Sequence, residues 1–562
     1  MIEFLIANMA PIMFATLVVF LLSGFPVAFS LAANGLMFGM LGIEVGLLKP
    51  ELLQALPNRL FGIMGNDTLL AIPFFTFMGL ILERSGMAED LLDTIGQLFG
   101  PLRGGIAYAV IFVGALLAAT TGVVAASVIS MGLISLPVML RYGYDRRIAS
   151  GVIAASGTLA QIIPPSLVLI VMADQLGRSV GDMYQAAIVP GLLLTVLYAF
   201  YVMAVSILRP SALPALPPEA RNLREANGSA GLPSLLAVIA AGVLAAWAFK
   251  HFYLALRKPN LAPDEAIVYA AVIGVAVTYG AALLNQKIRL GLLSKMAERV
   301  VLVLVPPLAL IFLVLGTIFV GIATPTEGGG MGALGAIILA LGNRRLNLDL
   351  LKQAMSSTTR LACFVMFILI GSSVFSLVFR GINGDLWVEH LLSSLPGGSA
   401  GFLIVVNLLF FALAFFLDFF ELAFILVPLV GPVADKMGID LIWFGVLLSV
   451  NMQTSFMHPP FGFALFYLRS VAPKQVKTSE IYWGAVPFVG LQVLMVALII
   501  AFPSMISVGS KIDMKEQLEL NINMHDNDFG GDTPNIQFKI EGDDMGDIKL
   551  DFPAEGANKP AK

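Results

Sequence analysis

The sequence has few charged side chains for its length. Only 12% of its 562 residues are Asp, Glu, Lys or Arg, about half the share of an average globular protein, whereas 58% are hydrophobic. A soluble chain of this length would fold as several domains, each needing a charged surface. The composition therefore excludes a soluble enzyme, a disordered chain and a nucleic-acid-binding protein. It predicts an all-α protein that crosses a lipid bilayer several times.

The sequence is also poor in residues that hold metals or perform catalysis. Its single cysteine, Cys363, cannot form an intrachain disulfide, and four scattered histidines do not suggest a metal cluster. The His-Glu-x-x-His, Gly-x-Ser-x-Gly and Walker A patterns are all missing from the sequence. We therefore expect neither an enzyme nor an ATPase, and no cofactor.

The two ends of the chain differ in character. The start lacks a basic region and a small-residue cleavage site, so residues 4–22 are predicted to be a retained helix. Residues 507–562 are predicted to be an acidic soluble tail, because 511–562 alone contain 12 acidic and 6 basic side chains. Weak alternation over residues 536–552 is compatible with a small β element and equally with disorder.

Several prolines, glycines and aspartates recur at a constant spacing of 295 residues. The pairs are Pro137 and Pro432, Gly143 and Gly438, Asp145 and Asp440, and Pro164-Pro165 and Pro459-Pro460. This register predicts that residues 1–208 and 299–506 are two copies of one unit. The linker, residues 209–298, contains two further apolar segments at 234–249 and 266–284, which we interpret as accessory membrane helices.

Charge predicts that the two copies have opposite orientations in the membrane. Arg141, Arg146 and Arg147 flank the first Gly-x-Asp turn, which the positive-inside rule places in the cytoplasm. The equivalent turn near Asp440 has a net charge of −1 and is expected outside. The two copies then form an inverted repeat, and both chain termini are expected in the periplasm.

Some apolar segments are too short to cross about 30 Å of hydrocarbon, which takes ~20 helical residues. We predict re-entrant hairpins at residues 106–140 and 402–434, and broken helices at residues 148–174 and 441–472. Broken helices leave backbone carbonyl and N–H groups without helical partners. Together with hydroxyl groups, these can bind a hard cation such as Na⁺ or an anionic substrate.

In the first copy, two polar segments coincide with these breaks. Thr120, Thr121 and Gly122 lie at the tip of the first hairpin, where small residues would equally allow close helix packing. A second group of polar residues precedes the first Pro-Pro pair. The alternative interpretation is that this pair only kinks the helix. The group consists of Ser156, Gly157 and Thr158, followed by Pro164 and Pro165.

In the second copy, the first candidate segment is rich in glycine. Residues 321–330 are not expected to form a regular helix, and they include Thr324, Thr326 and Glu327. A carboxylate is costly within a membrane, so Glu327 points to a functional site. The alternative is an external loop in which Glu327 is an ordinary surface carboxylate.

The other candidate segment of the second copy combines acidic and polar residues. Asp418 and Glu421 lie at the tip of the second hairpin and are three residues apart, so they share a helix face. They can bind a cation, carry a proton or pair with a basic residue. The second break adds further candidates: Asn451, Gln453, Thr454, Ser455, His458, Pro459 and Pro460. His458 would be a proton-linked switch or a structural hydrogen-bonding residue.

Five motifs carry a resemblance to a known family. They are Gly24-x-Pro26-Val27-Ala28, Ile72-Pro73-Phe74-Phe75, Ile163-Pro164-Pro165-Ser166, Gly321-Ile322-Ala323-Thr324-Pro325-Thr326-Glu327 and Pro459-Pro460-Phe461-Gly462. Over residues 1–208 and 299–506 the sequence resembles the large permease subunit, the M component, of tripartite ATP-independent periplasmic (TRAP) transporters. The resemblance implies a secondary active permease of the bacterial inner membrane with an elevator mechanism.

The family resemblance also implies partners, a coupling ion and a substrate class. The partners are a small membrane subunit, the Q component, and a periplasmic substrate-binding protein, the P component. The coupling ion is usually Na⁺, and the substrates are small organic acids. By position, Thr120, Gly157 and Thr158 would contribute to one Na⁺ site, and Thr454 and Ser455 to a symmetric one. The substrate would bind between the two sites.

The sequence departs from the family pattern at His458, where many members have threonine. Residues 416–421 and 453–456 resemble a branch associated with 2-oxo acids, and more loosely with mannitol and chloroaromatic compounds. The alternative function is a stand-alone divalent-anion symporter coupled to Na⁺ or H⁺, which needs no binding protein. A channel or a membrane enzyme fits the broken-helix repeat and the missing catalytic motifs less well.

Overall fold

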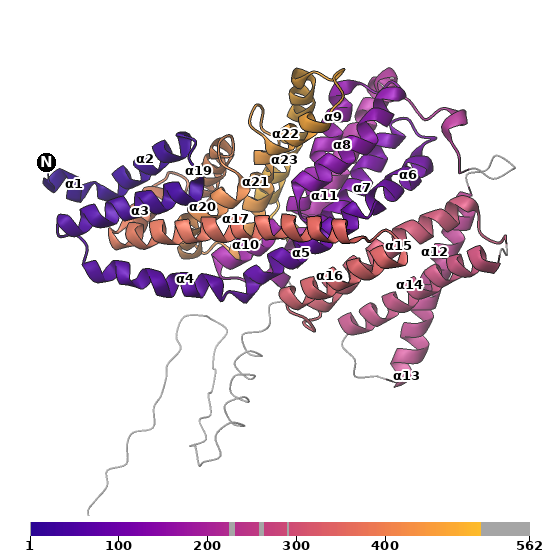
Figure 1. Cartoon of the computed structure of the whole chain (residues 1–562), viewed down its shortest axis with the longest axis horizontal. Helices are drawn as coiled ribbons and strands as arrows, with labels where there is room; N and C mark the ends of the chain where they lie inside the picture. The colour runs from indigo at the N-terminus through magenta and orange to yellow at the C-terminus, as the bar shows by residue number, and fades with distance from the viewer. Residues whose placement is uncertain (1, 224–230, 258–262, 289–290, 507–562) are drawn as a thin grey trace, which may run out of the picture. The chain divides into compact units, whose positions relative to one another are not determined.

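The computed structural model describes residues 2–223, 231–257, 263–288 and 291–506. Within these ranges the chain consists of helices joined by short loops and contains no strand (Figure 1). The tail from residue 507 onward, including the segment for which a β element was considered, lies outside the described residues. The prediction of an all-α protein is therefore confirmed for the described part.

The first half of the chain forms eleven α-helices. They are α1 (Ile2–Ala7), α2 (Met9–Leu22), α3 (Val27–Glu44), α4 (Leu56–Met64), α5 (Asp67–Arg84), α6 (Met87–Phe99), α7 (Gly105–Thr121), α8 (Val124–Arg141), α9 (Arg146–Thr158), α10 (Leu167–Leu176) and α11 (Val180–Leu208). A 3-10 helix, η1 (Pro50–Ala55), precedes α4, and another, η2 (Leu159–Gln161), continues α9. The predicted first hairpin thus consists of α7 and α8.

The linker contributes α12 (Leu232–Ala248), a π-helical turn (Phe249–Leu254), the short α13 (Ala255–Arg257) and α14 (Pro263–Ile288). The second half then follows. Its helices are α15 (Lys295–Phe319), α16 (Pro325–Gly342), α17 (Leu348–Gly381), α18 (Gly384–Ser393), α19 (Gly398–Leu413), α20 (Phe419–Lys436), α21 (Leu441–Met452), η6 (Gln453–Phe456), α22 (Phe463–Val471) and α23 (Thr478–Ala501).

Many of these helices match the dimensions of a lipid bilayer. In the described part of the chain, eight helices are long and apolar enough to cross a membrane, and ten spans result if each of two bent helix pairs is counted as one. They include the linker helix α14 as well as long helices of both halves, such as α11 and α17. Length and composition together make this a multi-pass membrane protein.

The two halves contain similar series of helices. From α6 to α11 and from α18 to α23, a short helix is followed by two hairpin helices, a broken helix and a long helix. Asp145 and Asp440 cap α9 and α21 by accepting hydrogen bonds from backbone N–H groups of the first turn. Both Pro-Pro bonds, at Pro164-Pro165 and Pro459-Pro460, are cis. Helices of the first half pack against helices of the second half: α5 packs along α16, and α3 packs along α17 (Figure 1).

The expectation that residues 321–330 lack regular helix is wrong in its second half, because α16 begins at Pro325. A capping box starts the helix: Glu327 N–H donates to Thr324 Oγ1, and Thr324 N–H donates to Glu327 Oε2 over 2.8 Å. The glycines that suggested a loop instead allow close packing on α5. A Cβ on Gly329 would lie 2.9 Å from the side chain of Phe74.

Three amphipathic or polar helices have no counterpart among the predicted apolar segments. These are α4, α6 and α18. Helices α4 and α18 are short, and each qualifies as part of a span only together with the helix that follows it, α5 or α19. Helix α6 is polar, since it carries Glu89, Asp90 and Asp93 on one side. Two of these acids form ion pairs: Arg345 Nη1, in the loop between α16 and α17, lies 2.8 Å from Asp90, and Arg299 Nη2 of α15 lies 2.7 Å from Asp93.

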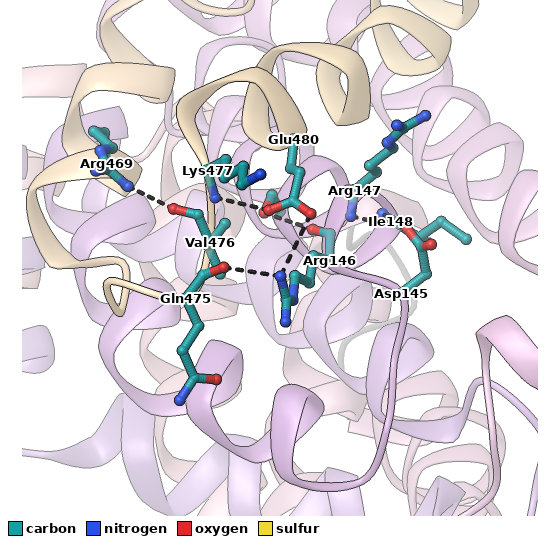
Figure 2. A network of polar contacts seen from close by, with 10 residues as sticks. Asp145, Arg146, Arg147, Ile148, Arg469, Gln475, Val476, Lys477 and Glu480 are labelled. Atoms are coloured by element: carbon teal, nitrogen blue, oxygen red, sulfur yellow. Dashed lines mark hydrogen bonds and ion pairs between the residues drawn. The ribbon is translucent and has the colours of Figure 1, made fainter.

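Helices α9 and α23 cross at two glycines. A Cβ on Gly151 would lie 2.1 Å from the Gly484 carbonyl oxygen, and one on Gly484 would lie 2.1 Å from the Arg147 carbonyl oxygen. Figure 2 shows polar contacts at one end of this crossing, where Arg146 donates to the Gln475 carbonyl and faces Glu480 at 3.7 Å. The crossing therefore ties a broken helix of the first half to the last long helix.

The linker helices α12 and α14 pack against each other through small residues. A Cβ on Gly242 would lie 2.0 Å from Thr278 Oγ1 and 2.9 Å from the Gly274 carbonyl oxygen. We expect Gly242→Leu to separate the pair and to lower the free energy of unfolding by about 1–3 kcal/mol, because overpacking forces the helices apart.

Thermal unfolding of the purified chain in detergent, followed by circular dichroism, measures this effect. Gly280→Leu on α14 is the matched control, because no heavy atom lies within 4 Å of its Cβ position. Equal melting temperatures for the two variants would contradict the packing role of Gly242.

Candidate functional site

A cavity of about 950 Å³ lies between the tips of the two hairpins. Its wall combines the start of α8, the start of α20, the breaks of both broken helices and one face of α17. The lining residues are Gly122, Val123, Val124, Ala125, Ile129, Gln161, Leu167, Ser357, Arg360, Leu361, Phe364, Asp418, Phe419, Phe420, Glu421, Phe456, Phe463 and Tyr467. Pockets of about 300–1,000 Å³ are typical of small-molecule sites.

The tip of the first hairpin touches the first broken helix. Gly122 has a left-handed backbone, with φ of 58°, and ends α7. A Cβ on Gly122 would lie 3.2 Å from Leu167 and 3.3 Å from the Pro165 carbonyl oxygen. Glycine is therefore needed here both for its backbone conformation and for its small size. The side chains of Thr120 and Thr121 lie outside the described part of the structure.

The tip of the second hairpin places two carboxylates at the cavity. Asp418 caps α20 by accepting a hydrogen bond from Glu421 N–H over 3.0 Å, and Glu421 accepts one from Asp418 N–H over 3.0 Å. This reciprocal capping box explains why an acidic pair begins the helix. Among the described residues, neither carboxylate forms an ion pair. Both residues lie where the connection from α19 enters α20.

Helix α17 brings a basic side chain to the same cavity. Arg360 is the only Lys, Arg or His among the described lining residues, and it makes no ion pair with any described residue. One turn earlier, Arg84 of α5 donates to Ser357 Oγ over 3.1 Å and to Gln353 Oε1 over 2.9 Å. These bonds hold the turn of α17 that carries Arg360 against α5.

Polar side chains from both halves meet where the broken helices face each other. Gln453 Nε2 donates to Thr158 Oγ1 over 3.1 Å, although the two residues are 295 positions apart. Gln492 Nε2 lies 3.4 Å from the same hydroxyl and donates to Tyr198 Oη over 2.9 Å. Thr158 itself donates to the Ala155 carbonyl. The structure therefore joins positions of the two halves that have the same place in the repeat.

The other predicted residues of the first break serve helix packing as well. A Cβ on Gly157 would lie 2.4 Å from Val128 Cγ2, so Gly157 lets α9 approach the hairpin helix α8. Ser156 Oγ donates to the Ile153 carbonyl over 3.0 Å and faces α7, where a Cβ on Gly114 would touch it. Both the functional and the packing interpretation of this segment are compatible with these contacts.

At the second break, the polar side chains are buried. Asn451 Nδ2 donates to the backbone carbonyl and to Oδ1 of Asn407 on α19, over 2.7 and 3.0 Å. Thr454 Oγ1 donates to the Asn451 carbonyl over 2.7 Å. Ser455 Oγ and Gln453 Oε1 are buried without a hydrogen-bond partner among the described residues. Oxygen atoms with free lone pairs are what a Na⁺ ion would require.

His458 is not among the described residues that line the cavity. Its ring stacks on Phe415 with centroids 4.1 Å apart and meets the edge of Phe411 at 4.4 Å. Only 1% of its surface is exposed, and no described side chain hydrogen-bonds to the ring. The adjoining pair, Pro459 and Pro460, forms the second cis break. This environment favours a packing role for His458 over direct substrate contact.

Thr324, Thr326 and Glu327 are also not among the described residues that line the cavity. All three lie at the exposed or partly exposed start of α16. Thr326 Oγ1 donates to the Asp67 carbonyl over 2.6 Å, which joins the start of α16 to the start of α5. Their visible contacts are those of helix capping and helix packing.

Two lining features were missed from the sequence. Arg360 and its neighbours on α17 were not singled out, although an arginine ahead of a long apolar run was a usable signal. The aromatic lining was also missed, since phenylalanines in a membrane helix give no sign of which face they occupy. Among the described residues, no group of three or more His, Cys, Asp or Glu side chains is arranged so that it could hold a metal ion.

Comparisons with known proteins agree with the fold and the motifs. The family described as "Tripartite ATP-independent periplasmic transporter, DctM component" matches residues 14–296 and 291–505. A C4-dicarboxylate TRAP transporter large permease protein from Pseudomonas aeruginosa is 28% identical over 459 residues, which cover 82% of this chain and 89% of that protein. The ectoine TRAP transporter large permease protein of Halomonas elongata is 25% identical, with coverage of 88% and 97%.

Two further similarities were found. The sialic acid TRAP transporter large permease protein of Vibrio cholerae is 24% identical, over 86% of this chain and 94% of that protein. Among solved structures, the YdaH transporter of Alcanivorax borkumensis superposes with a TM-score of 0.47 at 15% identity, covering 82% of this chain and 91% of that one. The three sequence relatives are all named transporter permeases, which is a non-enzymatic function. The chain belongs to the DctM family, the large permease component of tripartite ATP-independent periplasmic transporters.

Proposed function

We propose that this chain takes up small organic acids across a bacterial inner membrane, driven by a Na⁺ gradient. In this proposal a periplasmic binding protein delivers the substrate, and a small membrane subunit completes the permease. The relatives described above are named for a C4-dicarboxylate, ectoine and sialic acid. Their names therefore leave open which acid this chain carries.

The observation that carries the proposal is the cavity between the hairpin tips. Its lining includes one guanidinium that forms no ion pair with any described residue, and two carboxylates, and it is bordered by the breaks of both broken helices. An anionic substrate can pair with Arg360, while the carboxylates of Asp418 and Glu421 attract a cation. Co-binding of an anion and a cation at one place is what ion-coupled symport requires.

We place the coupling ions at the helix breaks. One Na⁺ site would use Thr120, Gly157 and Thr158, and the other Thr454 and Ser455. Support comes from the hydroxyl of Thr454, which donates its hydrogen to the Asn451 carbonyl and so keeps lone pairs for a cation. Ser455 Oγ, which has no hydrogen-bond partner among the described residues, adds a further oxygen. Thr158 Oγ1 accepts from Gln453 and Gln492, so a cation there would have to displace these amide donors.

We propose an elevator movement for the carrying unit. The hairpins and broken helices, α7–α10 and α19–α22, would move together with the part of the cavity wall that they form, along the face of α17 that completes it. The helices that exchange packing between the halves, α3, α5, α16 and α17, would stay fixed. This division rests on the close packing of α5 on α16 and of α17 on α3.

Reconstitution in liposomes tests the function. Uptake of a labelled carboxylate panel is measured under an inward Na⁺ gradient, with and without a candidate binding protein and small subunit. Uptake that needs both partners and Na⁺ is the expected result. Uptake by the chain alone would favour the stand-alone symporter instead, and uptake that follows a proton gradient without Na⁺ would overturn the coupling ion.

A further inference from the structure

We infer that the substrate of this permease carries a single carboxylate on a bulky apolar body, rather than two carboxylates. The inference rests on the proposed function and names the substrate class of the same cavity. It depends on the placement of Arg360 and on the aromatic side chains around it.

Arg360 accounts for one carboxylate and no more. It is the only basic side chain among the described lining residues, and its guanidinium has no ion-pair partner among the described residues. A guanidinium matches the geometry of one carboxylate through two parallel hydrogen bonds. Asp418 and Glu421 already add two negative charges to the cavity. The remaining polar side chains of the described lining, Gln161, Ser357 and Tyr467, are uncharged. A second carboxylate on the substrate would therefore find no second cation of the protein, and would meet like charge or neutral and apolar groups, which oppose its binding.

The face of α17 that meets the cavity changes from polar to apolar along the helix. Ser357, Arg360, Leu361 and Phe364 are spaced by three and four residues, so they share one side of the helix. A carboxylate held by Arg360 therefore places the rest of the molecule beside Leu361 and Phe364. A substrate with an apolar body satisfies that surface.

Aromatic rings surround the expected position of this body. Phe364 lies edge-on to Phe420, with centroids 6.0 Å apart, and Phe420 in turn contacts Phe419 at 4.4 Å. On the broken helix of the second half, Phe463 contacts Phe456 and Tyr467, each with centroids 6.5 Å apart. All of these rings line the cavity. Burial of apolar or aromatic ligand surface against such rings is favourable, whereas a hydrated dicarboxylate gains nothing from them.

Three acids test the single carboxylate and the apolar body of the substrate separately. Phenylpyruvate has one carboxylate and an aromatic body, pyruvate lacks the body, and succinate has two carboxylates. Their affinities for the full-length chain are measured in detergent with Na⁺ by the ligand-dependent shift in thermal unfolding. We expect phenylpyruvate to bind about ten-fold or more tightly than either of the others.

Variants assign this preference to individual side chains. Arg360→Gln should weaken phenylpyruvate binding by about ten-fold or more, and Arg360→Lys should restore part of it. Phe364→Ala should weaken phenylpyruvate binding while leaving pyruvate binding unchanged, and it provides a test independent of the arginine. Arg380→Gln is the matched control, because Arg380 is an arginine of α17 that does not line the cavity.

The outcomes distinguish the inference from the proposed function. Tighter binding of succinate than of phenylpyruvate overturns the single-carboxylate inference, but it leaves carboxylate transport in place. Unchanged phenylpyruvate binding in both Arg360→Gln and Phe364→Ala overturns the assigned site. If none of the three acids shifts the unfolding of a folded protein, the inference and the proposed transport of carboxylates both fail.

Discussion

Replacing Asp418 with Asn is expected to reduce Na⁺-driven uptake by about a hundredfold while leaving the protein folded. Asparagine caps helices as well as aspartate does, so the bond from Glu421 N–H to residue 418 and the start of α20 are retained. What the variant loses is one negative charge at the cavity. If that charge attracts the coupling cation, the substrate can still enter the cavity, but its uptake is no longer coupled to the Na⁺ gradient.

The measurement is initial uptake in liposomes under an inward Na⁺ gradient, together with gel filtration of the purified variant. Asp440→Asn is the matched control, because Asp440 caps α21 in the same way, with its carboxylate 2.7 Å from Trp443 N, and does not line the cavity. We expect Asp440→Asn to transport normally. Normal transport by Asp418→Asn would remove this carboxylate from the ion pathway.

Replacing Gly151 with Val is expected to prevent stable folding. The Cβ position of residue 151 lies 2.1 Å from the Gly484 carbonyl oxygen and 2.9 Å from Phe488, so a side chain there displaces the backbone of α23. Backbone atoms cannot move aside as the end of a flexible side chain can. We expect a destabilisation of about 3 kcal/mol or more, seen as loss of the monodisperse peak in detergent.

Gly490→Val is the matched control for this variant. Gly490 lies on α23, is exposed, and has no heavy atom within 4 Å of its Cβ position. The same change there should leave stability within about 0.5 kcal/mol of the unaltered chain. A Gly151→Val protein that elutes and melts like Gly490→Val would show that α9 and α23 do not cross as closely as the structure has them.

Much of this protein follows from the sequence by itself. The low charge and the long apolar segments predict a helical membrane protein because a bilayer excludes unpaired backbone groups and most charges. The spacing of 295 residues located both Pro-Pro breaks, and the Gly-x-Asp turns located the starts of α9 and α21. The acidic pair, Asp418 and Glu421, was found because carboxylates within apolar sequence are rare enough to stand out.

The tertiary structure alone decided which of these residues share a site. Spacing along the chain predicts which residues share a helix face, but it does not say which face meets which helix. Only the packing of α17 brings Arg360 into the lining of the same cavity as Asp418 and Glu421. The same packing left Thr324, Thr326 and Glu327 at a helix start outside the described cavity lining. Residues 328–330, which were expected in a loop because of their glycines, lie in helix α16. Small residues on α16 allow close contact with α5, and this contact cannot be predicted from the local sequence.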